Sequence, residues 1–379
     1  MKICIISSSH LSNDIRLYYK LATSLAKLGE VHVITTTGIS NDHTNPYQET
    51  VNSESRWGSL FQLYSAAAKY KPDIVVCVEP LTLLTGIMLR RKLRCKLVFD
   101  VHEFYPEAFT ERFPLILRLP AKYFYLTFEK WLESHCQLTI GVSREILYEL
   151  VPSSRIDQAL YLPNFPVKNV WDNSCEVPGG LSEICGMSFD LIYIGGLTAD
   201  RGVFKLLKVI SLIKTEVTNL SVLIVGKFFN SEVEKEFNSS INNYNLNKHI
   251  FVQEWVPAEK IGLLLKRSRF GLWLFNPKSK RMGMAMPLKV MEYLAAGLPV
   301  ITIKTPLMAS LIEKHGLGSC SSYTPSSIAE AAIKLLRMSP QDYEAMSKRC
   351  TDMAESRFNW EAIEPDLLKA VAKLGGSGS

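Results

Sequence analysis

Residues 287–300, PLKVMEYLAAGLPV, carry a single acid, Glu292, among apolar side chains. Pro287 suits the start of a helix and Gly297 suits its end, so the stretch predicts a short helix with Glu292 in its second turn. Lys289 lies three residues earlier and therefore on a nearby face. Pattern alone leaves two interpretations of Glu292: an acid that faces solvent or lies in the N-terminal half of the helix and is stabilised by the helix dipole, or a ligand-binding carboxylate.

A glycine-rich turn follows the apolar run FDLIYI in the same half of the chain. Gly195 and Gly196 come directly after this predicted strand, and Arg201 comes just before a predicted helix. Glycine lets the backbone approach a ligand closely, and a helix N-terminus beside a cation attracts anions. The turn is thus a candidate diphosphate site, although two glycines after a strand are weak evidence by themselves.

Polar residues also follow predicted strands in the first half of the chain. His102 and Glu103 come after KLVFDV, while Glu107 could pair with a nearby base. An isolated histidine at this point is more often a structural hydrogen-bonding group. Asp14 and Arg16 follow the first strand, and they fit ligand-binding residues as well as a helix cap and a helix-end charge.

The elements that must position these residues alternate between short apolar strands and helical segments. This βαβ pattern predicts parallel sheets, and it occurs twice: in residues 1–165 and, after a linker at 166–187, in residues 188–357. A helix over 358–374 could cross back to the first domain. Residues 375–379 have the composition of an engineered Gly/Ser linker. Ligands of such open sheets bind at the carboxyl ends of the strands.

Composition narrows the class of protein. The 379 residues have a formal net charge of +6 without a basic run of the nucleic-acid-binding kind. Eight scattered cysteines fit reduced thiols, and no stretch is long and apolar enough to span a bilayer. We therefore expect a cytoplasmic protein with no nucleic-acid partner.

Two aromatic segments have alternative interpretations. Residues 113–133 combine aromatic and apolar side chains with three bases, which suits either a membrane interface or, as pattern favours, a helix packed on the sheet. Trp255 is expected in the core rather than as a stacking platform. Lys278, Lys280 and Arg281 fit a solvated surface run as well as an anion site.

The blocks YIGGLTADRGVFKLL, PLKVMEYLAAGLPV and VFDVHEFYPEAF together resemble the retaining glycosyltransferases of family 4, which have the GT-B fold of two facing Rossmann-like domains with a cleft between them. Glu292 matches the second acid of the family's E-x7-E element, whereas Met284 stands at the first. Gly196 stands where the family often has arginine, and Arg201 replaces its lysine. The first-strand loop also lacks the family's glycine pair.

The resemblance implies a metal-independent hexosyltransferase without a cofactor. Its donor would be a UDP- or GDP-sugar, with ribose on Glu292 and diphosphate on Gly195, Gly196, Arg201 and Lys289. His102, Arg201 and Lys289 would be catalytic, and Asp14, Arg16 and Glu103 would lie on the acceptor side. Retention of configuration follows if the departing phosphate oxygen takes the acceptor proton.

The expected role is assembly of a bacterial surface polysaccharide or glycolipid, on a saccharide or lipid-linked acceptor, in the cytoplasm or at the inner face of the membrane. Two alternatives stay open. A sugar-nucleotide epimerase of the same architecture would use cleft acids such as Glu103 and Glu107 and would need no acceptor. A catalytically inactive partner subunit would explain Met284 and the missing glycines.

Overall fold

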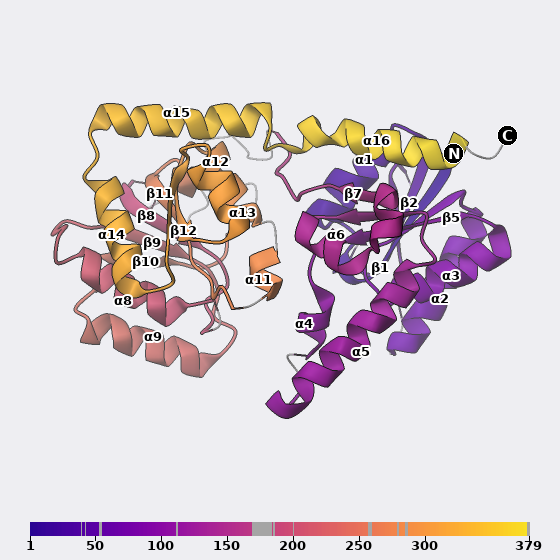
Figure 1. Cartoon of the computed structure of the whole chain (residues 1–379), viewed down its shortest axis with the longest axis horizontal. Helices are drawn as coiled ribbons and strands as arrows, with labels where there is room; N and C mark the ends of the chain where they lie inside the picture. The colour runs from indigo at the N-terminus through magenta and orange to yellow at the C-terminus, as the bar shows by residue number, and fades with distance from the viewer. Residues whose placement is uncertain are drawn as a thin grey trace. The chain divides into compact units, whose positions relative to one another are not determined.

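The structure is a computed structural model in which the chain forms two compact units (Figure 1). It describes residues 1–38, 40–41, 43–52, 55–110, 113–168, 184, 186–199, 201–256, 260–278, 280–284 and 287–376. The first unit, the N-terminal domain, comprises Met1–Val167, Met284–Met286 and Trp360–Ser379. The second unit, the C-terminal domain, comprises Lys168–Gly283 and Pro287–Asn359.

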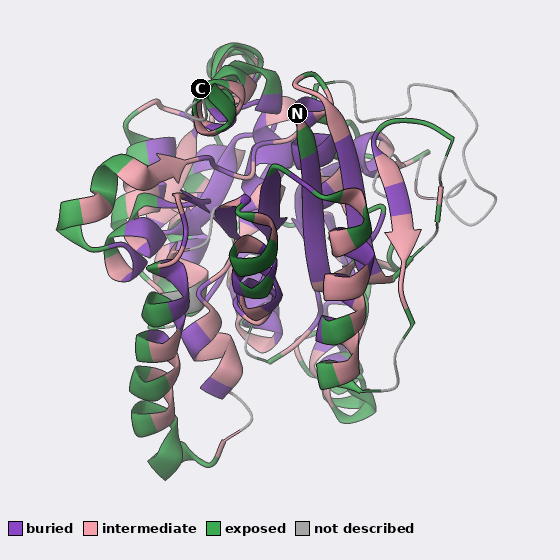
Figure 2. Ribbon diagram, turned by 90° about the vertical axis from the view of Figure 1, so that its right-hand side faces the viewer, coloured by how far each residue is buried: buried purple, intermediate pink, exposed green. Residues whose placement is uncertain are grey.

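The N-terminal domain is built on a seven-stranded parallel sheet in the order β3-β2-β1-β4-β5-β6-β7. Its strands are β1 (Lys2–Leu11), β2 (Glu30–Thr37), β3 (Tyr47–Thr50), β4 (Ile74–Cys77), β5 (Lys96–Val101), β6 (Leu138–Gly141) and β7 (Ala159–Tyr161). Consecutive residues Ile3–Ile6 are fully buried, as expected for a central parallel strand covered on both faces (Figure 2).

Helices connect these strands. They are the π-helix η1 (Ile15–Ala22), α1 (Thr23–Leu25), α2 (Arg56–Tyr70), α3 (Thr82–Leu93), α4 (Tyr105–Thr110), α5 (Leu115–Glu133), α6 (Arg144–Leu150), the 3-10 helix η2 (Ser153–Gln158) and α16 (Trp360–Gly376). The polar groups that follow β1, β4 and β5 share one edge of the sheet, because the strands run parallel.

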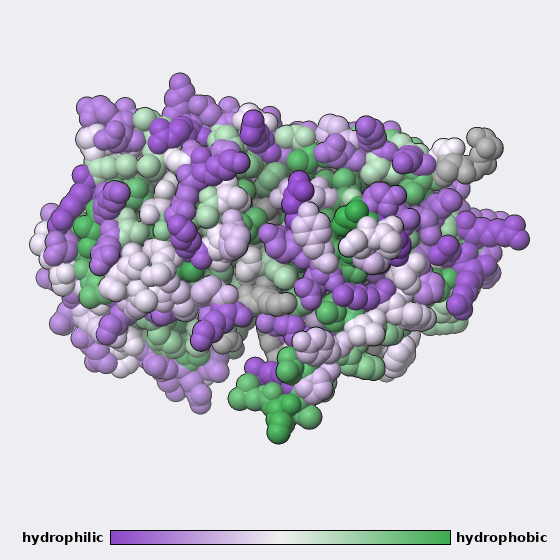
Figure 3. Space-filling model, viewed as in Figure 1, coloured by the Kyte–Doolittle hydropathy of each residue, from purple (hydrophilic) through white to green (hydrophobic). Residues whose placement is uncertain are grey.

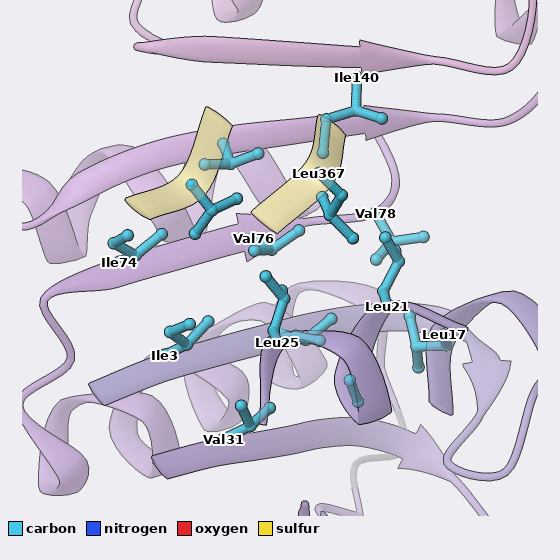
Figure 4. Packing of buried hydrophobic residues seen from close by; sticks show 14 of the residues in the cluster. Ile3, Leu17, Leu21, Leu25, Val31, Ile74, Val76, Val78, Ile140 and Leu367 are labelled. Carbon is cyan, nitrogen blue, oxygen red and sulfur yellow. The ribbon is translucent and has the colours of Figure 1, made fainter. Parts of the chain in front are cut away.

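The last helix, α16, packs onto the N-terminal domain although it lies about 200 residues further along the chain. Leu367 lies among core residues of the sheet and of η1, including Leu21 and Val76 (Figure 4). Trp360 donates from Nε1 to Ser24 Oγ at 2.8 Å, and Glu364 pairs with Lys27 at 2.6 Å. The helix therefore completes this domain's core.

The C-terminal domain has a six-stranded parallel sheet in the order β10-β9-β8-β11-β12-β13. Its strands are β8 (Phe189–Ile194), β9 (Val222–Val225), β10 (Ile250–Gln253), β11 (Ser268–Trp273), β12 (Val300–Ile303) and β13 (Gly318–Ser321). Its helices are α8 (Val203–Ile213), α9 (Ser231–Asn243), α10 (Ile261–Leu265), α11 (Lys280–Met284), α12 (Leu288–Ala295), α13 (Pro306–Met308), the π-helix η5 (Ala309–Glu313), α14 (Pro325–Leu336) and α15 (Pro340–Ser356).

The predicted fold class, two Rossmann-like domains with parallel sheets, is confirmed. The end of α12 also follows the predicted pattern, because Gly297 has a φ of 77°, a left-handed conformation that favours glycine. No helix in the described part of the chain is long and apolar enough to cross a membrane.

Candidate active site

The glycine turn of the C-terminal domain lies between β8 and α8. Gly195 donates its N–H to Val225 O at 3.0 Å, and both Gly195 and Gly196 are buried. A Cβ on Gly196 would lie 3.2 Å from Arg201 Nη1, so the guanidinium sits directly beside the turn. Arg201 is itself exposed. The structure thus brings Gly195, Gly196 and Arg201 together, as an anion site requires.

Helix α12 is tied to the same strand end through Tyr293. The hydroxyl of this buried tyrosine accepts a hydrogen bond from Ile194 N at 2.9 Å and donates to Leu272 O at 3.3 Å. Gly271 makes room for the ring, because a Cβ there would lie 2.3 Å from Tyr293 Cδ2. The position of α12, and therefore of Glu292, is fixed relative to the glycine turn.

Glu292 and Lys289 form an ion pair on α12. Lys289 Nζ lies 2.8 Å from Glu292 Oε2, and side-chain exposures are 16% and 9%. Glu292 is therefore not the solvent-facing acid of the first interpretation. The pair engages one oxygen of the carboxylate, which has capacity for further hydrogen bonds on its other oxygen, Oε1.

Trp255 lies on the loop after β10 and is half exposed, so the prediction of a core tryptophan is wrong. Its ring centroid is 5.7 Å from Lys289 Nζ, within the range of a cation–π contact. The candidate anion site at Lys278, Lys280 and Arg281 stays untested. Lys278 is exposed, and the side chains of Lys280 and Arg281 lie outside the described residues.

A buried carboxylate that the sequence did not single out organises the N-terminal domain's candidate site. Glu79 follows β4 and accepts hydrogen bonds from the backbone of Ser8 at 3.0 Å and from the Ser9 hydroxyl at 2.7 Å. It also accepts from the Ser7 hydroxyl, and His10 Nδ1 lies 2.7 Å from its Oε1. Glu79 therefore fixes the polar end of β1 against β4.

Hydrogen bonds and charge shift the pKa of Glu79 and His10 in opposite directions. Burial alone would raise the pKa of Glu79, but hydrogen bonds from His10 and Ser7, together with the charge of His10, lower it to about 2. Burial lowers the pKa of His10, yet the hydrogen bond and charge of Glu79 outweigh it, and the pKa is raised. The two side chains stabilise each other's charged forms.

His102 lies beside His10, with ring centroids 4.6 Å apart in an edge-to-face arrangement. Its ring also contacts the Tyr105 hydroxyl, at 3.2 Å from Nε2. Burial, followed by the charge of His10, lowers the pKa of His102. One histidine is therefore favoured as a cation and its neighbour as a neutral ring, the kind of separation that assigns acid and base roles.

Asp14 and Arg16 hold the first helix in place. Asp14 Oδ1 accepts from the backbone N–H of Arg16 at 2.8 Å and of Leu17 at 3.0 Å, so it is the N-cap of η1. The buried Arg16 donates from Nε to Asp100 Oδ2 at 2.8 Å and from Nη2 to Leu162 O at 3.4 Å. Its guanidinium links η1 to β5 and to the segment after β7, and an acceptor role for either residue stays a prediction.

The two acids after His102 differ in their surroundings. Glu103 is half-buried. Glu107 Oε1 lies 3.8 Å from Lys122 Nζ, which confirms that it pairs with a base. The described residues thus contain two candidate clusters, one in each domain: the histidine cluster (His10, Glu79, His102) and the anion cluster (Gly195, Gly196, Arg201, Lys289, Glu292).

Comparison with protein families agrees with this division. Residues 183–354 match the family model of the glycosyl transferases group 1, and residues 16–161 match that of Glycosyltransferase Family 4. The anion cluster falls in the first of these ranges, and Glu79 and His102 fall in the second. The two models together match most of the chain.

Two curated relatives match over part of the chain. A UDP-glycosyltransferase named TURAN from Arabidopsis thaliana is 30% identical over 168 residues, which are 42% of this chain and 34% of that protein. The chitobiosyldiphosphodolichol beta-mannosyltransferase of Debaryomyces hansenii is 24% identical over 157 residues, or 40% of this chain and 32% of that protein. The match spans about a third of the length of each relative.

Solved structures share the fold over the whole chain. HepE from Anabaena, in complex with UDP and glucose, has a TM-score of 0.75 at 14% identity and covers 98% of this chain and 100% of its own. Sucrose-phosphate synthase from Thermosynechococcus elongatus has a TM-score of 0.76 at 15% identity, with 100% of both chains covered. At this identity the likeness is one of fold, the GT-B fold.

Proposed function

We propose that this chain, both halves of which match glycosyltransferase family models, transfers a sugar from a nucleotide-diphosphate sugar to a saccharide or lipid-linked acceptor. The observation that carries the proposal is the anion cluster. Two buried glycines and the Arg201 guanidinium lie at the carboxyl end of β8, where open parallel sheets bind nucleotides, and α12, which carries the Lys289–Glu292 pair, is hydrogen bonded to the same strand end through Tyr293.

Each group of the anion cluster has a proposed part in donor binding. Backbone amides of the glycine turn, with Arg201 and Lys289, would bind the diphosphate. Glu292 would accept hydrogen bonds from the ribose hydroxyls on Oε1, the oxygen that Lys289 leaves available. UDP or GDP is the expected nucleotide, and the presence of UDP in the HepE structure favours the former.

The chemical step needs stabilisation of the leaving diphosphate more than it needs a covalent nucleophile. Arg201, Lys289 and the turn amides would supply positive charge where negative charge develops, so the mechanism does not call on a metal or a cofactor. We expect retention of configuration, in which the acceptor oxygen attacks the sugar on the face from which the diphosphate departs and the departing phosphate oxygen takes the acceptor proton. His102 would contact the donor sugar.

The histidine cluster favours a second stereochemical outcome, inversion. With His10 Nδ1–H held by Glu79, the Nε2 lone pair could take the proton of an acceptor hydroxyl that attacks the opposite face of the sugar. The name of the Debaryomyces hansenii relative, a beta-mannosyltransferase, specifies a β-linkage for that protein. Inversion would make His10 catalytic, whereas retention would leave it a structural group.

A transfer assay followed by NMR of the product tests these proposals. The protein would be incubated with UDP- and GDP-sugars and a panel of saccharide and lipid-linked acceptors. Acceptor-dependent release of nucleoside diphosphate supports a transferase, and the anomeric coupling constant separates retention from inversion. A new sugar nucleotide formed without acceptor would favour the epimerase, and donor binding with no turnover would favour an inactive partner subunit.

His10→Asn adds a second criterion to the same assay. If His10 is the base, the wild-type rate should rise with pH through the raised pKa of His10, and the variant should lose this limb. If configuration is retained, the variant should keep the pH profile of the parent. Transfer to saccharide or lipid-linked acceptors in this assay would support the proposed role in assembly of a surface polysaccharide or glycolipid.

A further inference from the structure

The first half of α5 exposes an unusual number of large apolar side chains. Ile116 is 85% exposed, Leu115 80% and Phe124 73%. The complete group, here called the α5 tip, comprises Leu115, Ile116, Leu117, Leu119, Tyr123 and Phe124. The patch appears green at the bottom of Figure 3, where α5 extends beyond the rest of its domain. Contiguous apolar surface of this kind marks an interaction site.

The second half of the same helix buries one of its faces, although Trp131 on its other face is 52% exposed. Leu126 and Leu132 are buried, and Glu133 accepts a hydrogen bond from Thr139 at 2.8 Å. The prediction that this segment is a packed helix is therefore wrong for the α5 tip, whereas the second half is partly buried and is hydrogen bonded to β6 through Thr139. Figure 2 shows the change along the helix, from green at its far end to purple and pink.

Acidic and basic side chains of α5 lie on different surfaces of the helix. Arg118 and Lys130 are exposed, whereas both acids of the helix, Glu129 and Glu133, are buried. Burial raises the pKa of Glu129 to about 8, so this side chain is mainly neutral at pH 7. The exposed surface of α5 is thus apolar, aromatic and basic, the combination that anionic lipid surfaces attract.

Topology places the α5 tip at the same edge of the sheet as the histidine cluster. Helix α4 follows the carboxyl end of β5, and α5 runs back to the amino end of β6. The start of α5 therefore lies at the carboxyl edge, where Glu79 follows β4 and His102 follows β5. Binding of the α5 tip to a lipid surface would therefore bring the histidine cluster close to the bilayer.

We propose that the α5 tip binds the surface of an anionic lipid bilayer, with its apolar side chains in the interface and Arg118 and Lys130 at the headgroups. The binding itself does not depend on the transferase activity. Delivery of a lipid-linked acceptor to the histidine cluster is a consequence that does rest on the proposed function. The chain would then meet its acceptor at the membrane surface.

Vesicle co-sedimentation of the full chain, without donor or acceptor, tests this binding. Vesicles of phosphatidylcholine with about a third phosphatidylglycerol would be compared with phosphatidylcholine alone. The test variant is the double substitution Ile116→Ser and Phe124→Ser. The matched control is Phe229→Ser, which removes an aromatic ring of the same 73% exposure from the C-terminal domain. Circular dichroism would establish that both variants are folded.

The proposal predicts that the parent and the control bind anionic vesicles, that salt and neutral lipid weaken binding, and that the double variant binds at least tenfold less. Equal binding by the double variant, or no binding by the parent, would overturn it. A dimer in sedimentation velocity that the double variant dissociates would also overturn it, because a second copy would then cover the α5 tip. Sugar transfer to a water-soluble acceptor, measured in parallel, tests the proposed function separately.

Discussion

The two domains share a Rossmann-like architecture, yet their candidate sites are built in different ways. The N-terminal domain holds its polar groups in a closed network in which Glu79, with its pKa lowered to about 2, binds the end of β1 and His10. The C-terminal domain instead has two glycines in a turn, an exposed Arg201, and a lysine that pairs with Glu292 through a single carboxylate oxygen.

This difference separates two tasks that one reaction needs. A network of short hydrogen bonds fixes a side chain and its protonation state before any ligand arrives, which suits positioning an acceptor or moving a proton. An open turn with cations nearby leaves room for a charged ligand to supply the missing partners. Substitutions in the Glu79 network should therefore act mainly on stability, and those of the glycine turn or of Glu292 mainly on donor affinity.

The largest effect is expected for Glu79→Gln in the N-terminal domain. The substitution replaces one of the two acceptor oxygens by an NH2 donor and removes the charge paired with His10, so it should lower the free energy of unfolding by about 3 kcal/mol at pH 7. It should also lower the pKa of His10. Urea unfolding and an NMR titration of the histidines measure the two effects.

The pH dependence of this loss has a defined sign. The pKa of Glu79 falls from an ordinary 4.5 to about 2 on folding, so its stabilisation is present above pH 4.5 and is lost as the pH falls toward 2. The difference between parent and variant should shrink over that interval. Glu330→Gln, at an exposed acid on α14, is the control and should change nothing. If the difference in free energy of unfolding between the parent and Glu79→Gln stayed constant down to pH 2, the proposed stabilisation of ionised Glu79 by its partners would be wrong.

A smaller loss of stability is expected for Tyr293→Phe in the C-terminal domain. The buried N–H of Ile194 loses its acceptor, which should cost about 2 kcal/mol in unfolding free energy. Since Tyr293 also ties α12 to β8, nucleotide affinity should fall as well. Tyr148→Phe, at an exposed tyrosine of α6, provides the comparison. A lower free energy of unfolding with unchanged nucleotide affinity would mean that donor binding does not depend on the hydrogen bond between Tyr293 and Ile194.

Gly196→Ala should act on affinity with little effect on folding. The added Cβ would meet Phe229 Cε2 at 3.0 Å and Arg201 Nη1 at 3.2 Å, both in side chains that can move. It would keep a diphosphate from approaching the turn, and we expect about tenfold weaker nucleotide binding by calorimetry, equivalent to about 1.4 kcal/mol.

Gly283→Ala is the control for this substitution, because a Cβ there meets nothing within 4 Å. Unchanged affinity in Gly196→Ala would remove the turn from the donor site. An equal loss in both variants would show that the effect is not specific to the turn.

Much of the fold could be predicted from the sequence, because buried parallel strands such as FDLIYI and the glycine that ends α12 have strong local signals. The group Gly195, Gly196 and Arg201 could be predicted for the same reason, since it lies within seven consecutive residues. The exposure of the α5 tip could not, because the composition of an apolar helix does not specify which of its turns the domain covers. The exposure of Trp255 could not either, because a single aromatic residue in a loop has no periodic pattern that specifies its burial.

The pairing of Glu79 with His10 also escaped prediction, for a topological reason. The two residues are 69 positions apart, and they meet only because β4 pairs directly with β1 in the sheet. The local sequence pattern of either segment does not predict which strands are neighbours in the sheet. A polar residue near the end of each of two buried strands was the available signal, and it becomes specific only once those strands are known to be neighbours.

The most direct test of the central claim, that the C-terminal domain binds a nucleoside diphosphate through Glu292, is thermal stabilisation by UDP, GDP, ADP, TDP, CMP and NAD. Ligand at about 100 times its dissociation constant should add about 2.7 kcal/mol, which is a shift of several degrees. We predict stabilisation of the parent by UDP or GDP, a smaller shift in Glu292→Gln, and the parent's full shift in Glu330→Gln. Stabilisation by no diphosphate, or an equal shift in Glu292→Gln, would contradict the claim.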